Sequence, residues 1–173
     1  MSTQKTAANA ATAANAAQES TNAQSTTATA EKLVVTINAV QVFENDGKVN
    51  VHIKFDETIK GYKAEGLTFE ECDVNCVDIP RPQLTRQLCE CSNLIADYRA
   101  TQEEAFGQKQ FALILREAKM TIVRTPHVAG ELTGRQNDQG QDIVYTRDCY
   151  TTDVVGVRLT ELATARLNRA TEL

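Results

Sequence analysis

The sequence predicts an α+β fold, mostly antiparallel β, in the form of an OB-like curved sheet or barrel. Three β-type segments come first, a helical stretch follows, and further β-type segments come after it. A strong hairpin signal also joins the first two segments. Three strands, a helix and two more strands is the order of elements in an OB fold. This analogy of element order covers residues 33–159, and other α+β meanders share it.

The first two strands carry the clearest local signals. Residues 33–43 (LVVTINAVQVF) are rich in β-branched side chains. Residues 48–55 (KVNVHIKF) alternate apolar and polar positions, as a strand with one buried face does. Between them, Asp46 and Gly47 form a dipeptide that favours a tight hairpin turn.

A third strand and a helical insertion are predicted next. Residues 58–70 form the third strand, which we expect to be bent or bulged at Gly61 and Gly66. The insertion covers about residues 82–117, between the third and fourth strands. Its apolar side chains recur at spacings of four, three, four and three, which is one face of a helix. These side chains are Leu84, Leu88, Cys91, Ile95 and Tyr98.

A second helix is expected to start inside this insertion. Thr101 to Glu104 (TQEE) has the form of a capping box, which marks helix N-termini. Gly107 weakens a helix that runs through it. Residues 106–118 therefore stay open between helix and strand.

The last third of the chain reads as strands followed by a short C-terminal helix. Residues 119–125 form a strand that Pro126 is expected to stop. Two apolar pieces then flank a polar loop at 134–141, and residues 153–159 form the last strand, giving five or six strands in all. The C-terminal helix, within residues 160–173, is expected to turn three side chains inward. These are Leu162, Ala163 and Leu167.

The N-terminal segment differs in composition from the rest. Residues 1–30 consist mainly of Ala, Thr, Asn, Gln and Ser and contain no aromatic residue. Such a segment cannot bury enough apolar surface to offset its ordering entropy, so a disordered tail is predicted. The alternative is an arm that orders against a partner. Residues 31–173 are predicted to form a single domain.

Charge, hydropathy and motifs limit the possible functions. The net charge is −5, so nucleic-acid binding would need a local basic face. No apolar run of about 18 residues is present, so no membrane span is expected. The sequence contains no phosphate-binding glycine loop and no hydrolase or zinc-protease motif. We therefore expect a protein that is not an enzyme and that needs no cofactor.

Four of the five cysteines lie within twenty residues, at Cys72, Cys76, Cys89 and Cys91. Their spacings are C-x3-C and C-x-C, whereas zinc sites usually use C-x2-C. On a helix, Cys89 and Cys91 would point about 200° apart, so they could not bind one ion together. We interpret the four as packing residues first, zinc ligands second and disulfides third. An odd cysteine count with no export signal favours a cytoplasmic location.

The two histidines are not expected to activate a cysteine. His52 lies on the polar face of a predicted strand, and His127 follows Pro126. Nothing in the sequence places either imidazole beside a thiol, so both are interpreted as solvent-facing.

The first functional hypothesis is single-stranded nucleic-acid binding, with single-stranded DNA as the best guess. Such sites combine a cationic groove with aromatic rings that stack on bases. The candidate cations are Lys48, His52, Lys54, Lys60, Lys63, Lys119 and Arg124, and the candidate stacking rings are Tyr62 and Tyr145. The alternative interpretation of these residues is an ordinary solvated sheet face with tyrosines at the rim of the core.

The second hypothesis is a structural or assembly subunit, of the kind that a phage or mobile element encodes. Residues 1–30 would reach across to a neighbouring subunit. Exposed strand edges such as 33–43 would pair between protomers of a homo-oligomer.

Overall fold

A computed structural model of the chain describes residues 29–65 and 68–172, so most of the predicted disordered tail lies outside the described residues. The elements are β1 (Glu31–Asn45), β2 (Lys48–Glu65), β3 (Thr68–Pro80), α1 (Arg81–Cys91), α2 (Asn93–Ala100), α3 (Gln108–Leu115), β4 (Lys119–Gln136), β5 (Asp142–Arg158) and α4 (Glu161–Thr171). Within this part of the chain, no helix is long and apolar enough to cross a bilayer.

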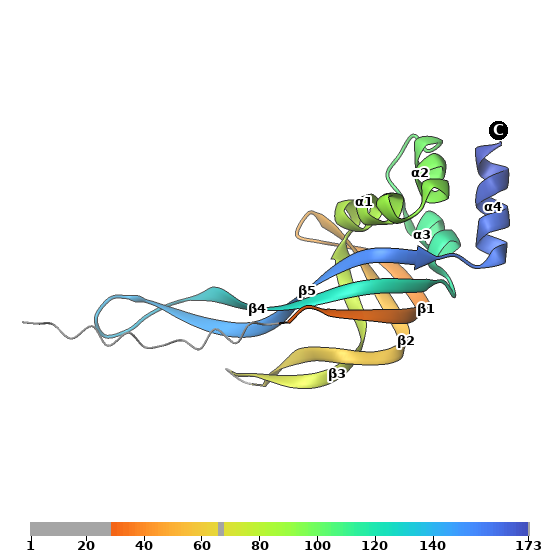
Figure 1. Ribbon diagram of the computed structural model, residues 1–173. Helices are drawn as coiled ribbons and strands as arrows, with labels where there is room; N and C mark the ends of the chain where they lie inside the picture. Colours follow the sequence, from red (N-terminus) through yellow and green to blue (C-terminus); the bar gives the residue numbers. More distant parts are fainter. Residues whose placement is uncertain (1–28, 66–67, 173) are drawn as a thin grey trace, which may run out of the picture.

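The strands form one antiparallel sheet in the order β3-β2-β1-β4-β5. The predicted α+β fold, its antiparallel sheet and its helices between the third and fourth strands are confirmed. The sheet is not closed, because β3 and β5 are its two edges, so a barrel is not confirmed. Figure 1 shows the helices gathered at one end, while β4 and β5 project far beyond the other strands at the opposite end.

The core lies between the sheet and the helices. Three phenylalanines are among its largest fully buried side chains, namely Phe55, Phe106 and Phe111. Phe106 and Phe111 meet edge to face, with ring centroids 5.7 Å apart. Burying each such ring contributes about 1.5–3 kcal/mol, so the segment between α2 and α3 is tied firmly to the core.

The predicted β1–β2 hairpin is confirmed. Asn45 pairs with Lys48, and the two turn residues between them have positive φ angles of 51° at Asp46 and 71° at Gly47. A two-residue turn with both φ angles positive matches the twist of the strands, and Asp-Gly tolerates it best.

The predicted third strand was wrong in its bounds. Residues 58–65 continue β2, and β3 begins only at Thr68, so Cys72 and Cys76 lie on a strand. The irregularity falls between Lys54 and Ile59, before Gly61. A Cβ on Gly61 would lie 2.8 Å from Val74 Cγ2. This glycine is therefore needed for the close approach of β3 rather than for a bend.

The helical insertion has three helices, with starts that differ from those predicted. The first predicted helix is interrupted at Ser92, whose hydroxyl caps α2 by accepting a hydrogen bond from Ile95 N. Thr101 is the C-cap of α2 and does not begin a new helix, so the predicted capping box there was wrong. The next helix instead starts after Gly107, whose N–H donates to Gln110 Oε1 at 3.0 Å. The FALIL run is thus helical.

The prediction that Pro126 stops a strand was also wrong. β4 continues through it and pairs with β5 as far as Gln136. The reason is that β1 pairs with β4 only as far as Arg124, so Pro126 lies where β4 has a free edge. A proline is tolerated on an edge because its missing N–H is not needed by a neighbour. Beyond Arg124, β4 and β5 form a two-stranded arm (Figure 1).

The C-terminal helix is confirmed, with one correction. Ala163 and Leu167 are buried, but Leu162 is 60% exposed. The Thr160 hydroxyl accepts a hydrogen bond from Ala163 N at 3.1 Å and fixes the helix start.

β1 changes its partner halfway along its length. Up to Thr36 it pairs with β4, and from Ile37 it pairs with β2. Glu57 accepts hydrogen bonds from Thr36 N at 2.6 Å and from the Thr36 hydroxyl at 2.8 Å. Ile37 N donates to Ala118 O at 2.9 Å. These contacts satisfy the backbone at the point where the ladder is interrupted.

Two glutamines from the helices take the place of missing strand partners. Gln108 accepts from Val42 N at 2.7 Å and donates to Val40 O at 2.8 Å, on the edge of β1 that β4 no longer covers. Gln87, which is 5% exposed, accepts from Val154 N at 3.0 Å on the edge strand β5. The helical insertion therefore covers two sheet edges.

The partner change of β1 leads to a pH-dependent prediction. Burial would raise the pKa of Glu57, but the hydrogen bonds from Thr36, helped by Lys119, hold this pKa below its ordinary value. A lowered folded-state pKa stabilises the protein above the unfolded pKa of about 4.3, and this contribution is lost as pH falls through the folded value. We expect Glu57→Gln to lower the free energy of unfolding at pH 7 by at most about 1 kcal/mol, given its exposure.

Urea unfolding at pH 7 and at about pH 3 measures the effect, and the deficit should shrink at the lower pH. Glu44→Gln, an exposed carboxylate elsewhere on β1, is the matched control. A deficit of equal size at both pH values would show that the Glu57 charge does not stabilise the partner change.

Candidate functional site

A cavity of about 290 Å³ lies where the two ends of the open sheet face each other. We call it the Arg124 cavity. Its lining from β2 and β3 consists of Gly61, Tyr62, Val74, Cys76, Val77 and Asp78, and its lining from β4 and β5 consists of Arg124, Cys149, Tyr150 and Thr152. Strands that are far apart in the sheet order therefore contribute to one site.

Arg124 is the most unusual residue in this cavity. It follows Met120 and Ile122 on the inward face of β4 and is only 6% exposed. Its Nε and Nη1 atoms are buried and have no hydrogen-bond partner among the described residues. Burial lowers the pKa of the Arg124 guanidinium, although Tyr150 and Glu31 partly oppose the change. An arginine nevertheless keeps its proton, so a largely unpaired cation lines the cavity.

Two tyrosines bridge the open side of the sheet beside this cation. The rings of Tyr62 on β2 and Tyr150 on β5 are stacked, with centroids 5.5 Å apart and planes inclined by 22°. The guanidinium carbon of Arg124 lies 4.3 Å from the centroid of the Tyr150 ring, within the range of a cation–π contact. The result is a layered group of two rings and one cation.

Carboxylates on β3 face several of the predicted basic residues on β2. Lys60 Nζ lies 2.9 Å from Asp73 Oδ1 and 3.7 Å from Glu71 Oε1. The hydrogen bond with Asp73 raises the pKa of Lys60. His52 Nδ1 lies 2.7 Å from Asp78 Oδ1. The β2 face is therefore a mixed one, in which part of the positive charge is already neutralised.

The structure brings only some of the predicted binding residues together. Tyr62 and Arg124 share the cavity, and His52 contacts Asp78 at its rim. The exposed side chains of Lys48, Lys54, Lys63 and Lys119 are distributed along β2 and at the start of β4, outside the cavity lining. Tyr145 pairs with Glu131 in the arm, but its side chain lies outside the described part of the structure.

A histidine and a cysteine meet at the base of the arm. His127 pairs with Cys149 in the ladder, and Nε2 of the imidazole lies 2.9 Å from the thiol Sγ. Nδ1 of the same ring lies 3.2 Å from the Thr151 hydroxyl. The prediction of His127 as a solvent-facing side chain with no thiol nearby was therefore wrong in its second part. The pairing depends on the register of β4 and β5, which the spacing in sequence does not reveal.

The five cysteines are all free thiols of intermediate exposure. Cys89 and Cys91 pack against the core, in agreement with the packing interpretation, and Cys91 Sγ lies 3.8 Å from Val154 O. Among the described residues, no group of three or more His, Cys, Asp or Glu side chains is arranged to hold a metal ion. This covers the zinc candidates Cys72 and Cys76 on β3 as well.

Tyr150 is a cavity residue that the sequence-based site did not include. A signal was available, since Arg124 lies on a predicted later strand and both Tyr145 and Tyr150 lie nearby in sequence. The choice between the two tyrosines required the ladder register, in which Pro126 pairs with Tyr150 two residues from Arg124.

The cysteine environments predict an order of reaction with an alkylating reagent. Burial raises the pKa of the Cys89 and Cys91 thiols, so their reactive thiolate fractions at pH 8 are small. The imidazole of His127 can accept the proton of Cys149. We expect iodoacetamide to modify Cys149 before Cys89 and Cys91, as followed by peptide mass spectrometry over time.

The variant His127→Gln tests the role of the imidazole. It should slow the modification of Cys149, while Cys89 and Cys91 react as in the wild-type chain. Equal rates for Cys149 in both proteins would show that the imidazole does not assist the thiol.

Comparisons of the chain with protein-family models, with curated proteins and with solved structures found no match. We therefore infer a function from the geometry around the Arg124 cavity.

Proposed function

We propose that the protein is a non-catalytic binder of single-stranded nucleic acid and that the strand crosses the Arg124 cavity. The stacked pair of Tyr62 and Tyr150 beside the guanidinium of Arg124 is the observation that carries this proposal. Proteins that bind single strands combine aromatic rings for the bases with cations for the backbone, and arginine on an aromatic face adds to this. Single-stranded DNA is the form we test first.

The order of elements supports this proposal. The strand order, with helices inserted between β3 and β4, is that expected for an OB-like sheet. OB folds bind oligonucleotides on the face of strands 2 and 3 and with the loops that follow strands 1 and 4. In this chain β2 and β3 supply one wall of the cavity, and the hairpin of β4 and β5 supplies the other.

The charge distribution sets the expected strength of salt dependence. Asp73 and Glu71 already pair with Lys60, which leaves Arg124 and exposed lysines such as Lys54 for phosphates. About three to five neutralised phosphates would give a slope of log K against log salt of about −2 to −3.5. This is a modest slope for a nucleic-acid binder, consistent with the net charge of −5.

Binding to the full chain is measured by the fluorescence anisotropy of labelled oligo-dT of about 25 nucleotides, long enough to cover an OB-sized site. We expect preference for the single strand over a duplex of equal length, with the salt slope given above. Tyr62→Ala should weaken binding about 5- to 150-fold, because one stacking interaction contributes about 1–3 kcal/mol. Lys54→Glu with Lys63→Glu should weaken binding and reduce the slope.

The double variant Lys109→Glu on α3 with Arg116→Glu directly after it is the control for these charge reversals, since it makes the same change outside the cavity. If the wild-type chain fails to bind oligo-dT even at low salt, the nucleic-acid function is rejected.

Assembly is the second candidate function, and the arm favours it. Residues Val128 and Ile143 on the arm are 64% and 40% exposed. Exposed apolar side chains on a projecting hairpin are suited to contact with another protein chain. In this case the protein would be a structural subunit whose arm packs against a neighbouring protomer.

The assembly hypothesis predicts a mass greater than that of one chain in light scattering after size-exclusion chromatography. The double variant Val128→Ser with Ile143→Ser should shift this mass toward the monomer, because it removes the apolar contact while keeping the strands. Leu162→Ser, which changes an exposed leucine on α4, is the control. A monomeric wild-type chain at all concentrations tested would eliminate this function.

A further inference from the structure

We infer that the Arg124 cavity is a seat for one phosphate group of the bound strand, with Arg124 as its specific ligand. This inference rests on the proposed nucleic-acid function and adds a defined contact to it. The cation–π contact, the burial of Arg124 and the size of the cavity together support it.

The guanidinium of Arg124 is incompletely paired. The residue is 6% exposed, and its Nε and Nη1 find no acceptor among the described residues. A buried donor without a partner is costly, and a buried charged donor more so. Tyr150 offers the cation only its π face. An incoming oxyanion would supply the missing acceptors, and its negative charge would add to that of Glu31.

The guanidinium is reached from the cavity side. Nε and Nη1 have almost no exposed surface even toward the cavity, so an acceptor meets them when the guanidinium turns toward the cavity that Arg124 lines. The cavity is bounded by Gly61, where a side chain would collide with Val74. The absence of a side chain there lets β2 and β3 lie close together at this wall of the cavity.

The shape of the guanidinium and the size of the cavity fit a phosphate group. A volume of about 290 Å³ is large enough for one phosphate with its sugar. The planar guanidinium presents its N–H groups in a fork that matches the oxygens of a phosphate. Tyr62 and Tyr150 lie beside the same space, so a base attached to that sugar can stack on a ring. Thr152, which also lines the cavity, adds a polar residue to its wall.

One residue of the cavity lining opposes the binding of an anion. Asp78 also lines the cavity, and its negative charge is repulsive toward phosphate. Its Oδ1 atom lies 2.7 Å from His52 Nδ1, which holds this carboxylate on the His52 side. Arg124 comes from the opposite wall, on β4, so the phosphate is placed with Arg124 and away from Asp78.

The test uses the wild-type full chain labelled with ¹⁵N and follows the Nε–Hε signal of Arg124 by NMR. Four probes are added in turn: the dinucleotide d(TpT), dTMP, inorganic phosphate and thymidine. We expect a saturable shift with the probes that carry phosphate and none with thymidine. A shift with d(TpT) but not dTMP assigns the seat to an internal phosphodiester, and the reverse assigns it to a strand end. Equal shifts with thymidine, or no shift with any probe, would overturn the inference.

Variants connect the seat to strand binding. Arg124→Gln should lower the affinity for oligo-dT about 10- to 100-fold, as expected for the loss of charge-assisted hydrogen bonds. The salt slope should become less steep by about 0.7, which corresponds to one phosphate. Arg124→Lys keeps the charge but lacks the fork, so it should restore the slope and only part of the affinity. Arg116→Gln, directly after α3, is the control, and circular dichroism checks folding.

The two proposals can fail separately. Oligo-dT binding that is unchanged by a folded Arg124→Gln protein would remove the phosphate seat and leave nucleic-acid binding intact. A phosphate-dependent shift of Arg124 without any oligo-dT binding would keep the oxyanion site and reject the nucleic-acid function. Should Arg124→Gln unfold, the four probes on the wild-type chain decide the question alone.

Discussion

The fold depends on one constraint, which is that β1 serves two partners along different halves of its length. Thr36 is the last residue that pairs with β4, and Ile37 is the first that pairs with β2. A backbone that leaves one ladder for another has polar groups that need other partners. Glu57 and the carbonyl of Ala118 supply them. Because of this change, the two ends of the sheet meet at a cavity instead of lying apart in a flat sheet.

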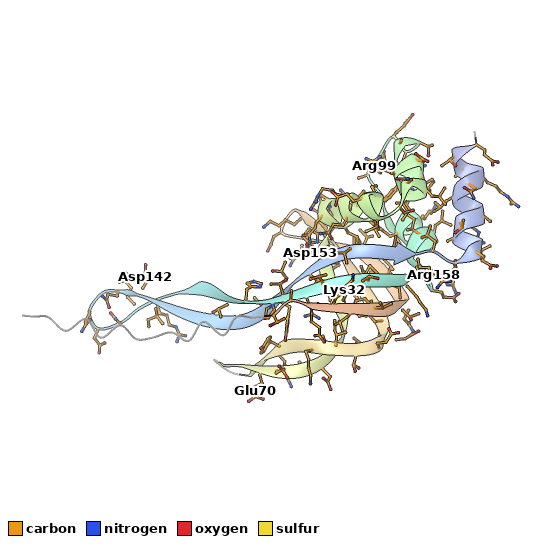
Figure 2. All side chains as sticks on the ribbon, viewed as in Figure 1. Lys32, Glu70, Arg99, Asp142, Asp153 and Arg158 are labelled. Carbon is orange, nitrogen blue, oxygen red and sulfur yellow. The ribbon has the colours of Figure 1, made fainter. Side chains whose placement is uncertain are left out.

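The same constraint explains why the helices sit where they do. After the partner change, the second half of β1 has a free edge, and β5 is an edge strand throughout. Gln108 and Gln87 satisfy these edges with side-chain amides, which provide a donor and an acceptor like a peptide group. An edge blocked in this way is protected from pairing with another chain. The outer arm of β4 and β5 has no such cover from the helices (Figure 2, where Asp142 marks its far end and Asp153 lies beside α1).

The cavity is a consequence of an open sheet that is bridged by side chains. Tyr62 and Tyr150 stack where a closed barrel would have backbone hydrogen bonds. Arg124 lies on the inward face of β4, where the preceding inward residues are the apolar Met120 and Ile122. A cation therefore lies at the border of the core. In the proposed function, the aromatic rings and the buried guanidinium would favour a single strand over a duplex, because only unpaired bases present free faces for stacking. The carboxylates of β3 limit how strongly charge alone can contribute.

The sequence by itself determined the features that depend on neighbours along the chain. The Asp46-Gly47 turn, the buried face of α1 and α2, and the antiparallel α+β class all follow from local conformational preference and apolar spacing. Tertiary structure alone decided the features that depend on register. It carried β4 past Pro126 because β1 leaves that edge free, and it placed His127 beside Cys149. It also paired the two tyrosines of the cavity, since residues on strands far apart in the order meet only when the whole sheet curves, which no local pattern encodes.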